Sequence, residues 1–317
     1  MNRIPQGVVG KAFCSTANLG AGFDVFGLAL NKYADKVSVR LTSGSQVRIF
    51  VKGILGRSIP REVNRNSAGP PAIALLRKAG LKSGLEISIE KNVPQGLGLG
   101  SSGATAAAVT KTLDHLLGLR LSDDELVRIA SLGEKAVAGS AHADNVAASI
   151  LGGFVIVYDR PVRVVSLKPP RDLITVVAIP KLALIPNKTK NARKVVPTGV
   201  DVKKAILNIG RASAIVAGFA KGDIQMIGTG MEDEIAEPYR ERLIPGFSRV
   251  KRAALQAGAA GVSISGAGPS LIAIVDRRDH DPRPVGRAML KGFAGNNVRS
   301  SWFIARPALG ATIIEAS

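Results

Sequence analysis

The sequence has few of the residues that build disulfide frameworks and transition-metal centres. Its 317 residues include one cysteine, Cys14, and three histidines, His115, His142 and His280. One cysteine excludes an internal disulfide framework and any cysteine-cluster metal site, and three scattered histidines leave few ligands for a zinc centre. We therefore interpret Cys14 as a small hydrophobic residue of a buried strand rather than a nucleophile.

Aromatic residues and long apolar runs are also scarce. Only 13 residues are aromatic (9 Phe, 3 Tyr and 1 Trp), so the core must consist mostly of Ala, Val, Ile and Leu. The longest apolar run, Leu173–Pro180, is far shorter than the roughly 20 residues that span a bilayer. Residues Met1–Gly10 contain no continuous hydrophobic block of the kind found in a signal peptide. We expect a cytoplasmic protein without membrane association.

Acidic residues are too few to balance the basic ones. Lys and Arg total 43 against 24 Asp and Glu, which gives a net charge of +19. Residues 160–205 alone contain 11 basic and 2 acidic residues, a local excess of +9. This segment is either a solvated surface or part of a site for an anionic substrate. A nucleic-acid partner stays open at this point, although the scarcity of aromatic rings argues against base stacking.

Secondary-structure patterns are clear in both halves of the chain. Alternating apolar and polar residues predict strands over 36–41, 46–51 and 85–89. Helices are expected over 67–79, over 101–117 and from a capping box at Ser122 and Glu125 onward. A turn near residue 159, where we place the domain boundary, separates strands over 154–158 and 162–167. The second half is expected to contain strands over 173–179, 261–265, 271–276 and 301–305, and helices over 203–220, 249–257 and 285–293.

The segment most informative about function is Pro94–Thr105, with the sequence PQGLGLGSSGAT. It follows a predicted strand and opens a predicted helix. Glycines let backbone amides converge on an anion, and the start of the helix adds unsatisfied N–H groups and about half a positive charge. Ser101, Ser102 and Thr105 add hydroxyls suited to phosphate oxygens or Mg²⁺. The segment predicts a site for the phosphate chain of a nucleotide.

Two better-known nucleotide motifs do not account for this segment. Gly98-x-Gly100-x-x-Gly103 fits the dinucleotide fingerprint literally, but the acidic residue about twenty positions on, Asp123, belongs to a helix cap and not to the end of a strand. A P-loop needs Gly-Lys-Ser/Thr, and the segment contains no lysine. A purely structural glycine turn is the remaining alternative, which the Ser-Ser pair at the helix start disfavours.

Residues 94–104 resemble the phosphate loop of the GHMP kinases, Pro-x-x-x-Gly-Leu-Gly-Ser-Ser-Gly/Ala, with a slightly extended glycine stretch. Other segments extend the resemblance, in particular to the homoserine kinases of this superfamily. They are Ser15–Leu30 (STANLGAGFDVFGLAL), Gly139–Gly153 (GSAHADNVAASILGG) and Glu237–Gly246 (EPYRERLIPG), while Gly261–Ser270 (GVSISGAGPS) is similar to the third motif of the superfamily. The matches run from about residue 10 to beyond residue 270.

The resemblance implies an α+β fold of two domains. The N-terminal GHMP kinase domain, residues 1–158, would resemble domain 2 of ribosomal protein S5 and carry the phosphate-binding loop, and the C-terminal domain, residues 159–317, would be ferredoxin-like. The implied activity is ATP-dependent phosphorylation of the side-chain hydroxyl of L-homoserine to O-phospho-L-homoserine, a step of threonine biosynthesis. ATP and Mg²⁺ are the implied cofactors and L-homoserine the small-molecule partner, and we expect a homodimer.

The same resemblance assigns the nucleotide and metal contacts. A loop serine and a downstream glutamate hold Mg²⁺ in the family, so we expect Ser101 or Ser102, together with Glu134, to do so here. Ser102, Glu134 and Asn145 are the expected catalytic residues. Without the resemblance, Glu134 would be interpreted as an ordinary acid of a helix surface. The residues expected to bind ATP are Asn66, Pro94, Gly96, Gly98, Leu99, Gly100, Ser101, Ser102, Gly103, Ala104 and Thr105.

Homoserine is a zwitterion, so its ammonium group needs acceptors and its carboxylate needs a fork-shaped donor. By the family match, two arginines are the candidates for the carboxylate, and Arg240 is the firmer placement of the two. The residues expected at the amino acid are Asn18, Asp24, His142, Asp144, Asn145, Arg193 and Arg240.

Asn145 decides the expected path of the proton. Some GHMP kinases, mevalonate kinase among them, use an aspartate as the base that takes the hydroxyl proton. An amide can orient a hydroxyl by hydrogen bonding but cannot accept its proton at neutral pH. We therefore expect that no protein base acts directly and that the proton passes to a γ-phosphate oxygen. Asp144 or His142 would be the alternative base.

Two other functions remain to be distinguished from this one. The first is another small-molecule kinase of the same superfamily, acting on shikimate or mevalonate, against which the Asn-Leu-Gly-x-Gly-Phe-Asp and His-x-Asp-Asn segments argue. The second is a basic RNA- or DNA-binding protein, because domains like that of ribosomal protein S5 occur in translation proteins and the charge is +19. Such a protein needs no Ser-Ser phosphate loop, so we consider nucleic acid an unlikely partner.

Overall fold

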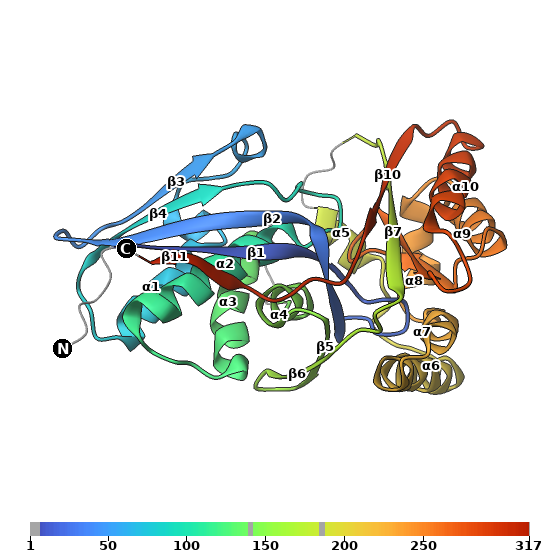
Figure 1. Cartoon of the computed structure of the whole chain (residues 1–317), viewed down its shortest axis with the longest axis horizontal. Helices are drawn as coiled ribbons and strands as arrows, with labels where there is room; N and C mark the ends of the chain where they lie inside the picture. The colour runs from blue at the N-terminus through green and yellow to red at the C-terminus, as the bar shows by residue number, and fades with distance from the viewer. Residues whose placement is uncertain (1–6, 139–141, 184–187, 317) are drawn as a thin grey trace.

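The structure is a computed structural model that describes residues 7–138, 142–183 and 188–316. Its strands form two sheets that follow each other along the long axis of the molecule (Figure 1). The strands are β1 (Gly7–Ala17), β2 (Phe26–Thr42), β3 (Val47–Lys52), β4 (Gly84–Glu90), β5 (Phe154–Asp159), β6 (Arg163–Leu167), β7 (Leu173–Pro180), β8 (Gly261–Ile264), β9 (Leu271–Asp276), β10 (Ser300–Ala305) and β11 (Thr312–Ala316).

Helices cover both sheets. Those of the first half are α1 (Gly69–Lys78), α2 (Ser101–Leu117), α3 (Asp123–Ala138) and α4 (Asp144–Leu151), with short 3₁₀ helices η1 (Ile54–Gly56) and η2 (Val63–Arg65). Those of the second half are α5 (Lys188–Lys194), α6 (Val202–Lys221), α7 (Ile224–Gly230), α8 (Glu237–Arg240), α9 (Phe247–Gln256) and α10 (Pro282–Ala294), with η3 (Glu241–Leu243).

The first sheet has seven strands, and α1 to α4 lie together on one of its faces (Figure 1). Its central path runs β11-β1-β2-β4-β3, and β5 pairs with β2 and β6 with β5. Val37 and Val39 of β2 are buried opposite Ile89 and Ile87 of β4, which confirms the strands predicted from alternation. Apolar residues on one face of each strand therefore form the core beneath the helices.

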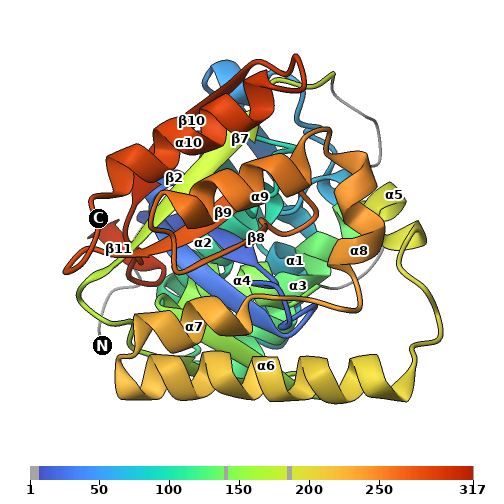
Figure 2. The same ribbon diagram turned by 90° about the vertical axis from the view of Figure 1, so that its right-hand side faces the viewer.

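The second sheet is antiparallel, with the order β10-β7-β9-β8. The chain passes through it as β-α-β-β-α-β, which is the ferredoxin-like connection. Helices α9 and α10 cover one face, where Val250, Val285 and Phe293 are buried (Figure 2). The α+β class and the two-domain GHMP kinase fold expected from the sequence are thus confirmed.

A shared hydrophobic core joins the two sheets. It includes Phe26 of β2, Ile272 of β9 and Phe219 of α6. The ring of Phe154, at the start of β5, stacks on that of Phe219 with 3.9 Å between centroids and an interplanar angle of 5°. Cys14 is buried in the same core, where desolvation raises the pKa of its thiol to about 11, so it behaves as the hydrophobic residue that we expected.

The helix bounds follow the local signals closely. Helix α2 spans the predicted residues, and Gly100 before it has the left-handed φ of 62°. At the start of α3, the Ser122 hydroxyl accepts from the backbone N–H of Glu125 (3.4 Å) and the Glu125 carboxylate accepts from the N–H of Ser122 (3.3 Å), so the capping box is confirmed. Helices α4, α5, α7 and α8 were not predicted.

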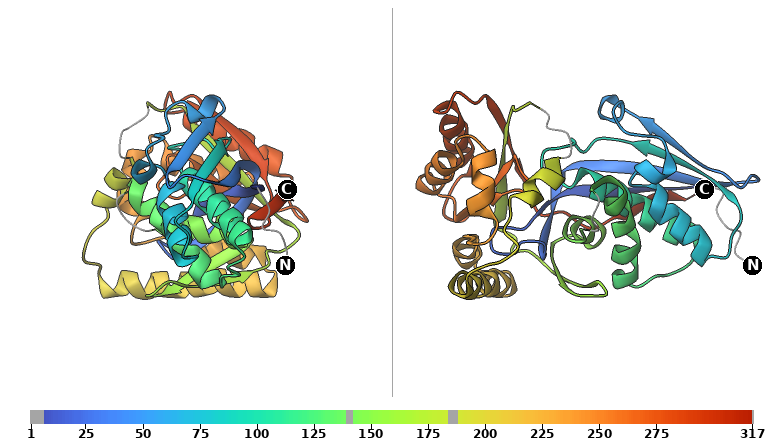
Figure 3. Two further views of the ribbon diagram at one scale, coloured as in Figure 1. Left: turned by 90° about the vertical axis from the view of Figure 1, so that its left-hand side faces the viewer. Right: turned by 180° about the vertical axis from the view of Figure 1, so that it is seen from behind.

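The end of the chain returns to the first sheet. Strand β11 pairs antiparallel with β1, and the C-terminus lies beside the first sheet, away from the second (Figure 3). Strand β6 also belongs to the first sheet. Both strands follow residue 158 along the chain but belong to the first sheet, so the sheets do not divide the chain at a single residue. The domain boundary near residue 159 stays a prediction.

Two expectations reach beyond the described residues. Residues 1–6, part of the segment judged to lack a signal peptide, lie outside them, as do 184–187 within the basic segment. Within the described ranges, none of the helices combines the length and apolar composition that crossing a bilayer requires.

Candidate active site

A cavity lies where the five motif segments meet between the two sheets. Its lining takes at least one residue from each of them: Asn18, Ser102, Asn145, Arg240 and Gly266. The side-chain amide of Asn18 donates to the carbonyl of Gly266 (2.9 Å), which joins residues 248 positions apart. Gly139 to Ala141, the first residues of one motif, lie outside the described part of the chain.

The loop of residues 94–105, called the phosphate-binding loop after its expected role, needs its glycines for conformation and for close approach. Gly96, Gly98 and Gly100 have φ of 69°, 76° and 62°, values that side chains rarely allow. A Cβ on Gly98 would lie 2.1 Å from the carbonyl oxygen of Ser265, whose hydroxyl donates to the Gly98 carbonyl (2.8 Å). The loop therefore rests directly on the 261–270 motif and leads into the first turn of α2, where backbone N–H groups lack partners within the helix.

A buried ion pair that the sequence analysis missed lies under the loop. Lys91 pairs with Asp35, and both side chains are buried. Lys91 also donates to the carbonyl of Ser101 (2.7 Å), and Asp35 accepts from the backbone N–H of Val93 (2.9 Å). The Thr105 hydroxyl donates to Asp35 (2.6 Å), so it is held in this network; Thr105 does not line this cavity but lines the adjoining one described below.

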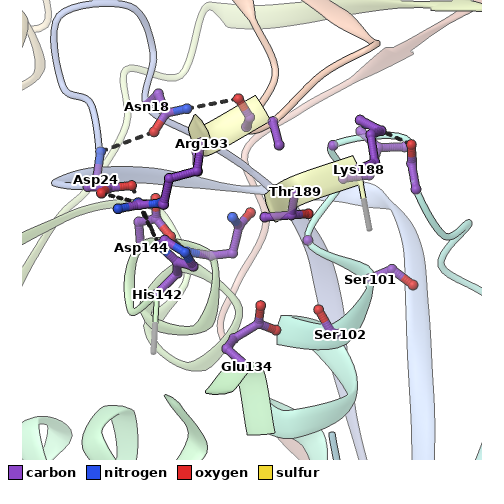
Figure 4. A pocket seen from close by; sticks show the side chains of 18 of the residues that line it. Asn18, Asp24, Ser101, Ser102, Glu134, His142, Asp144, Lys188, Thr189 and Arg193 are labelled. Atoms are coloured by element: carbon purple, nitrogen blue, oxygen red, sulfur yellow. Dashed lines mark hydrogen bonds and ion pairs between the residues drawn. The ribbon is translucent and has the colours of Figure 1, made fainter. Parts of the chain in front are cut away.

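Glu134 and Ser102 face each other at one end of the cavity (Figure 4). Burial raises the pKa of Glu134, a hydrogen bond with Ser102 partly offsets this, and its Oε1 atom has no hydrogen-bond partner among the described residues. Ser101 instead donates to the carbonyl of Val93 (2.9 Å). A buried carboxylate oxygen without a donor, beside a hydroxyl, fits a hard cation such as Mg²⁺.

No cluster of three or more metal-ligating side chains occurs in the described ranges. Mg²⁺ commonly binds through one or two carboxylates together with substrate phosphates and water, so the pair of Ser102 and Glu134 suits it.

Charged side chains gather at the other end of the cavity (Figure 4). Arg193 of α5 forms an ion pair with Asp24 and lies 3.1 Å from Nδ1 of His142. Burial alone would raise the pKa of Asp24, but the hydrogen bonds and charges of His142 and Arg193 outweigh it and lower that pKa. The same contact with Asp24 raises the pKa of His142.

Asp144 and Asn145 begin α4 beside this cluster. Desolvation, with the charge of Asp24, raises the pKa of Asp144 to about 6. Its carboxylate accepts from the backbone N–H of Asn145 (2.7 Å). The hydroxyl of Ser15, buried on β1, donates to Oδ1 of Asn145 (3.0 Å).

Arg240 closes the cavity from α8. It is buried, donates to the carbonyls of Ala192 (3.0 Å) and Gly266 (3.3 Å), and lies 4.7 Å from the centroid of the Phe23 ring. Desolvation lowers its pKa. Asp24 has a φ of 58° and Asn18 a φ of 75°, strained backbone of the kind concentrated in functional sites.

A second cavity adjoins the first and shares Gly96, Ser101, Ser102 and Thr189 with it. Asn66 lines this cavity, but its amide also holds a turn, donating to the Pro60 carbonyl (2.6 Å) and accepting from the Ala68 N–H (2.9 Å). Of the other expected ATP contacts, Leu99 lines the first cavity, whereas Pro94, Gly103 and Ala104 line neither.

Helix α5 adds two cavity residues that the sequence analysis missed, Lys188 and Thr189. The basic excess of residues 160–205 was the signal available for them. That segment contributes Lys188 and Arg193 to the cavity, while Arg163 is an exposed residue paired with Asp124. The segment therefore contains both cavity residues and exposed residues, and a site for an anionic substrate there stays a prediction.

The chain is similar to known proteins over most of its length. Residues 67–153 match the family model of the GHMP kinases N terminal domain, and residues 215–292 match GHMP kinases C terminal. A homoserine kinase of Thermoplasma acidophilum is 42% identical over 270 residues, which cover 85% of this chain and 84% of that protein. One from Pyrobaculum islandicum is 41% identical over 272 residues, 86% and 89% of the two chains. The crystal structure of homoserine kinase from Cytophaga hutchinsonii has a TM-score of 0.89 at 35% identity and 99% coverage of both chains.

Proposed function

The chain belongs to the homoserine kinases of the GHMP kinase family, and from this we infer that it transfers the γ-phosphoryl group of ATP to the side-chain hydroxyl of L-homoserine. The product is O-phospho-L-homoserine, a precursor in threonine biosynthesis. The observation that carries the inference is 42% identity to a homoserine kinase over 85% of the chain. The cavity supports it, because an anion-binding loop and a charged cluster suited to a zwitterion line the same space.

We propose that the triphosphate of ATP binds to the backbone N–H groups of the phosphate-binding loop and of the first turn of α2. Left-handed glycines and the helix start are the features that support this site. The adenosine would then extend into the adjoining cavity lined by Asn66. Thr105 contributes indirectly, because its hydroxyl belongs to the buried network that fixes Ser101 over Lys91.

Ser102 and Glu134 are the proposed ligands of Mg²⁺. The unpartnered Oε1 of Glu134 and the orientation of Ser102 toward it favour Ser102 over Ser101. Bound Mg²⁺ would supply charge neutralisation for the phosphates. Burial makes ionisation of Glu134 unfavourable, and a bound cation would offset that cost.

Homoserine binds, in our proposal, at the charged end of the cavity. Arg240 and Arg193 present guanidinium groups for its carboxylate, and Asp24 and Asp144 present acceptors for its ammonium group. Asn18 keeps Asp24 in place, because its Oδ1 accepts from the Asp24 backbone N–H (3.1 Å).

Asn145 positions the substrate hydroxyl without taking its proton. Ser15 donates to Oδ1 of the amide, so Nδ2 is the group available to donate to the hydroxyl oxygen. A donor at that oxygen leaves the hydroxyl proton directed elsewhere. We propose that this proton passes to an oxygen of the γ-phosphoryl group, without a protein base.

An assay of ADP release with homoserine, mevalonate and shikimate as acceptors tests the function. Homoserine is expected to be the substrate. Activity with shikimate or mevalonate and none with homoserine would replace the proposal with the other superfamily kinases considered above.

A homodimer is proposed as well. Its support is the apolar face that α6 exposes, where Val202, Ile206 and Ile209 are 71%, 62% and 66% exposed. Light scattering at several concentrations should give twice the chain mass, and the Ile206→Glu variant should shift it toward the monomer. A wild-type monomer at high concentration would contradict the proposal.

A further inference from the structure

Lys188 is a basic residue of the cavity that the roles above leave unassigned. It is the first residue of α5, and its Nζ donates to the carbonyl oxygen of Gly96 in the phosphate-binding loop (2.8 Å; Figure 4). Gly96 lines both cavities, as does Thr189, the next residue of α5. Lys188 therefore lies where the cavities meet, which is where a phosphoryl group must pass between the two substrates.

Other basic residues near the cavity form ion pairs with carboxylates, whereas Lys188 donates to a neutral carbonyl. Arg193 pairs with Asp24 and Lys91 pairs with Asp35. Over the described ranges, no carboxylate lies within ion-pairing distance of Lys188, and the oxygen that it contacts is a neutral carbonyl. Desolvation and the nearby charge of Arg240 lower the pKa of Lys188 to about 7.

A bound anion would stabilise the charged form of Lys188. Hydrogen bonds between charged partners are roughly twice as strong as neutral ones, so an ammonium group that donates to a neutral carbonyl gains by exchanging it for a phosphate oxygen. The flexible four-carbon stem of lysine permits such a movement without displacement of α5.

The position of Lys188 identifies the part of the nucleotide that it can reach. Ser102 and Glu134 approach the cavity from α2 and α3, whereas Lys188 approaches from α5 (Figure 4). We propose that Lys188 releases Gly96 when ATP binds and contacts the γ-phosphoryl group, across the cavity from Ser102 and Glu134. The proposal rests on the proposed function, since it requires the triphosphate on the loop.

A structural role is the main alternative. The contact with Gly96 joins α5 to the phosphate-binding loop, so Lys188 could serve only to hold the two together. In that case, replacing Lys188 would weaken the binding of every nucleotide that contacts the loop, whether or not the nucleotide has a γ-phosphoryl group.

The two roles are separated by comparing nucleotides. The Lys188→Met variant is measured with Mg²⁺ and either ADP or the non-hydrolysable ATP analogue AMP-PNP, by calorimetric titration. Lys190→Met, an exposed lysine of the same helix, is the matched control. Lys188→Gln is measured in parallel, so that the test does not depend on the folding of one variant.

Loss of a contact with the γ-phosphoryl group should weaken AMP-PNP binding about 10- to 100-fold. Binding of ADP and the KM of homoserine should stay within about threefold of the wild type, and kcat should fall. Lys190→Met should match the wild type throughout.

Equal weakening of ADP and AMP-PNP, or no weakening of either, would overturn the role of Lys188 while leaving the proposed function intact. Failure of the wild-type protein to bind either nucleotide would overturn the proposed function itself.

Discussion

The hydroxyl of Ser15 lies 3.0 Å from Oδ1 of Asn145 and donates a hydrogen bond to it. Ser15 is fully buried on β1, and the same hydroxyl is 3.2 Å from the backbone carbonyl of Asn145. A Cβ on Gly100 would come within 2.2 Å of the Ser15 hydroxyl. These contacts therefore fix the amide of Asn145 relative to Ser15, the first residue of the 15–30 motif, and to the phosphate-binding loop.

This arrangement predicts a modest effect of removing the amide. Asn145→Ala should lower kcat about 10-fold, the cost of one positioning hydrogen bond, and should leave the pH dependence of kcat unchanged. Steady-state kinetics at several pH values measure both quantities, with a thermal melt to establish that the variant is folded. A loss of 10²–10⁴-fold in a folded variant, as for removal of a general base, would contradict direct transfer of the proton to ATP.

Glu134→Gln separates metal binding from folding, because the two side chains have nearly the same shape. Burial raises the pKa of Glu134 in the folded state above its value in the unfolded state. The folded protein therefore loses stability as the pH rises from the unfolded-state pKa through the folded-state pKa. Without Mg²⁺ at pH 8, the variant should therefore melt no lower than the wild type.

The same variant should lose at least about 100-fold in kcat. The rise in melting temperature that Mg²⁺ adds to ADP binding should also disappear. An unchanged response to Mg²⁺ would remove Glu134 from the metal site.

Arg193→Met tests the recognition of the homoserine carboxylate. Charge-assisted hydrogen bonds contribute about 1.5–3 kcal/mol, so the KM of homoserine should rise at least about 10-fold while the KM of ATP stays within about threefold. The alternative substrate 3-aminopropan-1-ol lacks the carboxylate, so its KM should differ little between the wild type and the variant. Equal losses with both substrates would show that Arg193 acts through Asp24 and not on the carboxylate.

The two substrates should report two different ionisations. The pKa of Asp144 is raised to about 6, and the carboxyl faces Asp24, His142 and Arg193. Protonation removes an acceptor for the substrate ammonium group, so kcat/KM for homoserine should fall below about pH 6.

The pKa of Lys188 is lowered to about 7, with Arg240 as the charge that faces it. Loss of the ammonium charge should make kcat/KM for ATP fall above about pH 7. Lys188→Met should remove this alkaline limb only; an alkaline limb that persists in that variant would assign it to another group.

The sequence predicted those parts of the molecule that depend on local signals. The start of α2 follows from Gly100 and the serines after it, and the start of α3 follows from Ser122 and Glu125. In each case the deciding contacts lie within a few residues, where spacing and side-chain type determine the geometry.

Contacts between distant segments were beyond such signals. Lys91 and Asp35 are 56 positions apart, and a buried ion pair has no periodic pattern. Lys188 and Gly96 are 92 positions apart, and α5 is a short basic helix without an apolar face long enough to reveal it. The family resemblance predicted distant residues of the site only within the motifs that carry it, and Lys188 lies outside those motifs.

In the proposed complex, the phosphate-binding loop holds the triphosphate so that a bound homoserine reaches its terminal phosphorus. A crystal structure with Mg²⁺, AMP-PNP and homoserine tests it directly. We expect the β- and γ-phosphates on the backbone N–H groups of residues 96–103, with the homoserine hydroxyl roughly 3–3.5 Å from the γ-phosphorus and beside Nδ2 of Asn145. A nucleotide bound elsewhere, or a homoserine hydroxyl turned away from the γ-phosphorus, would contradict the account.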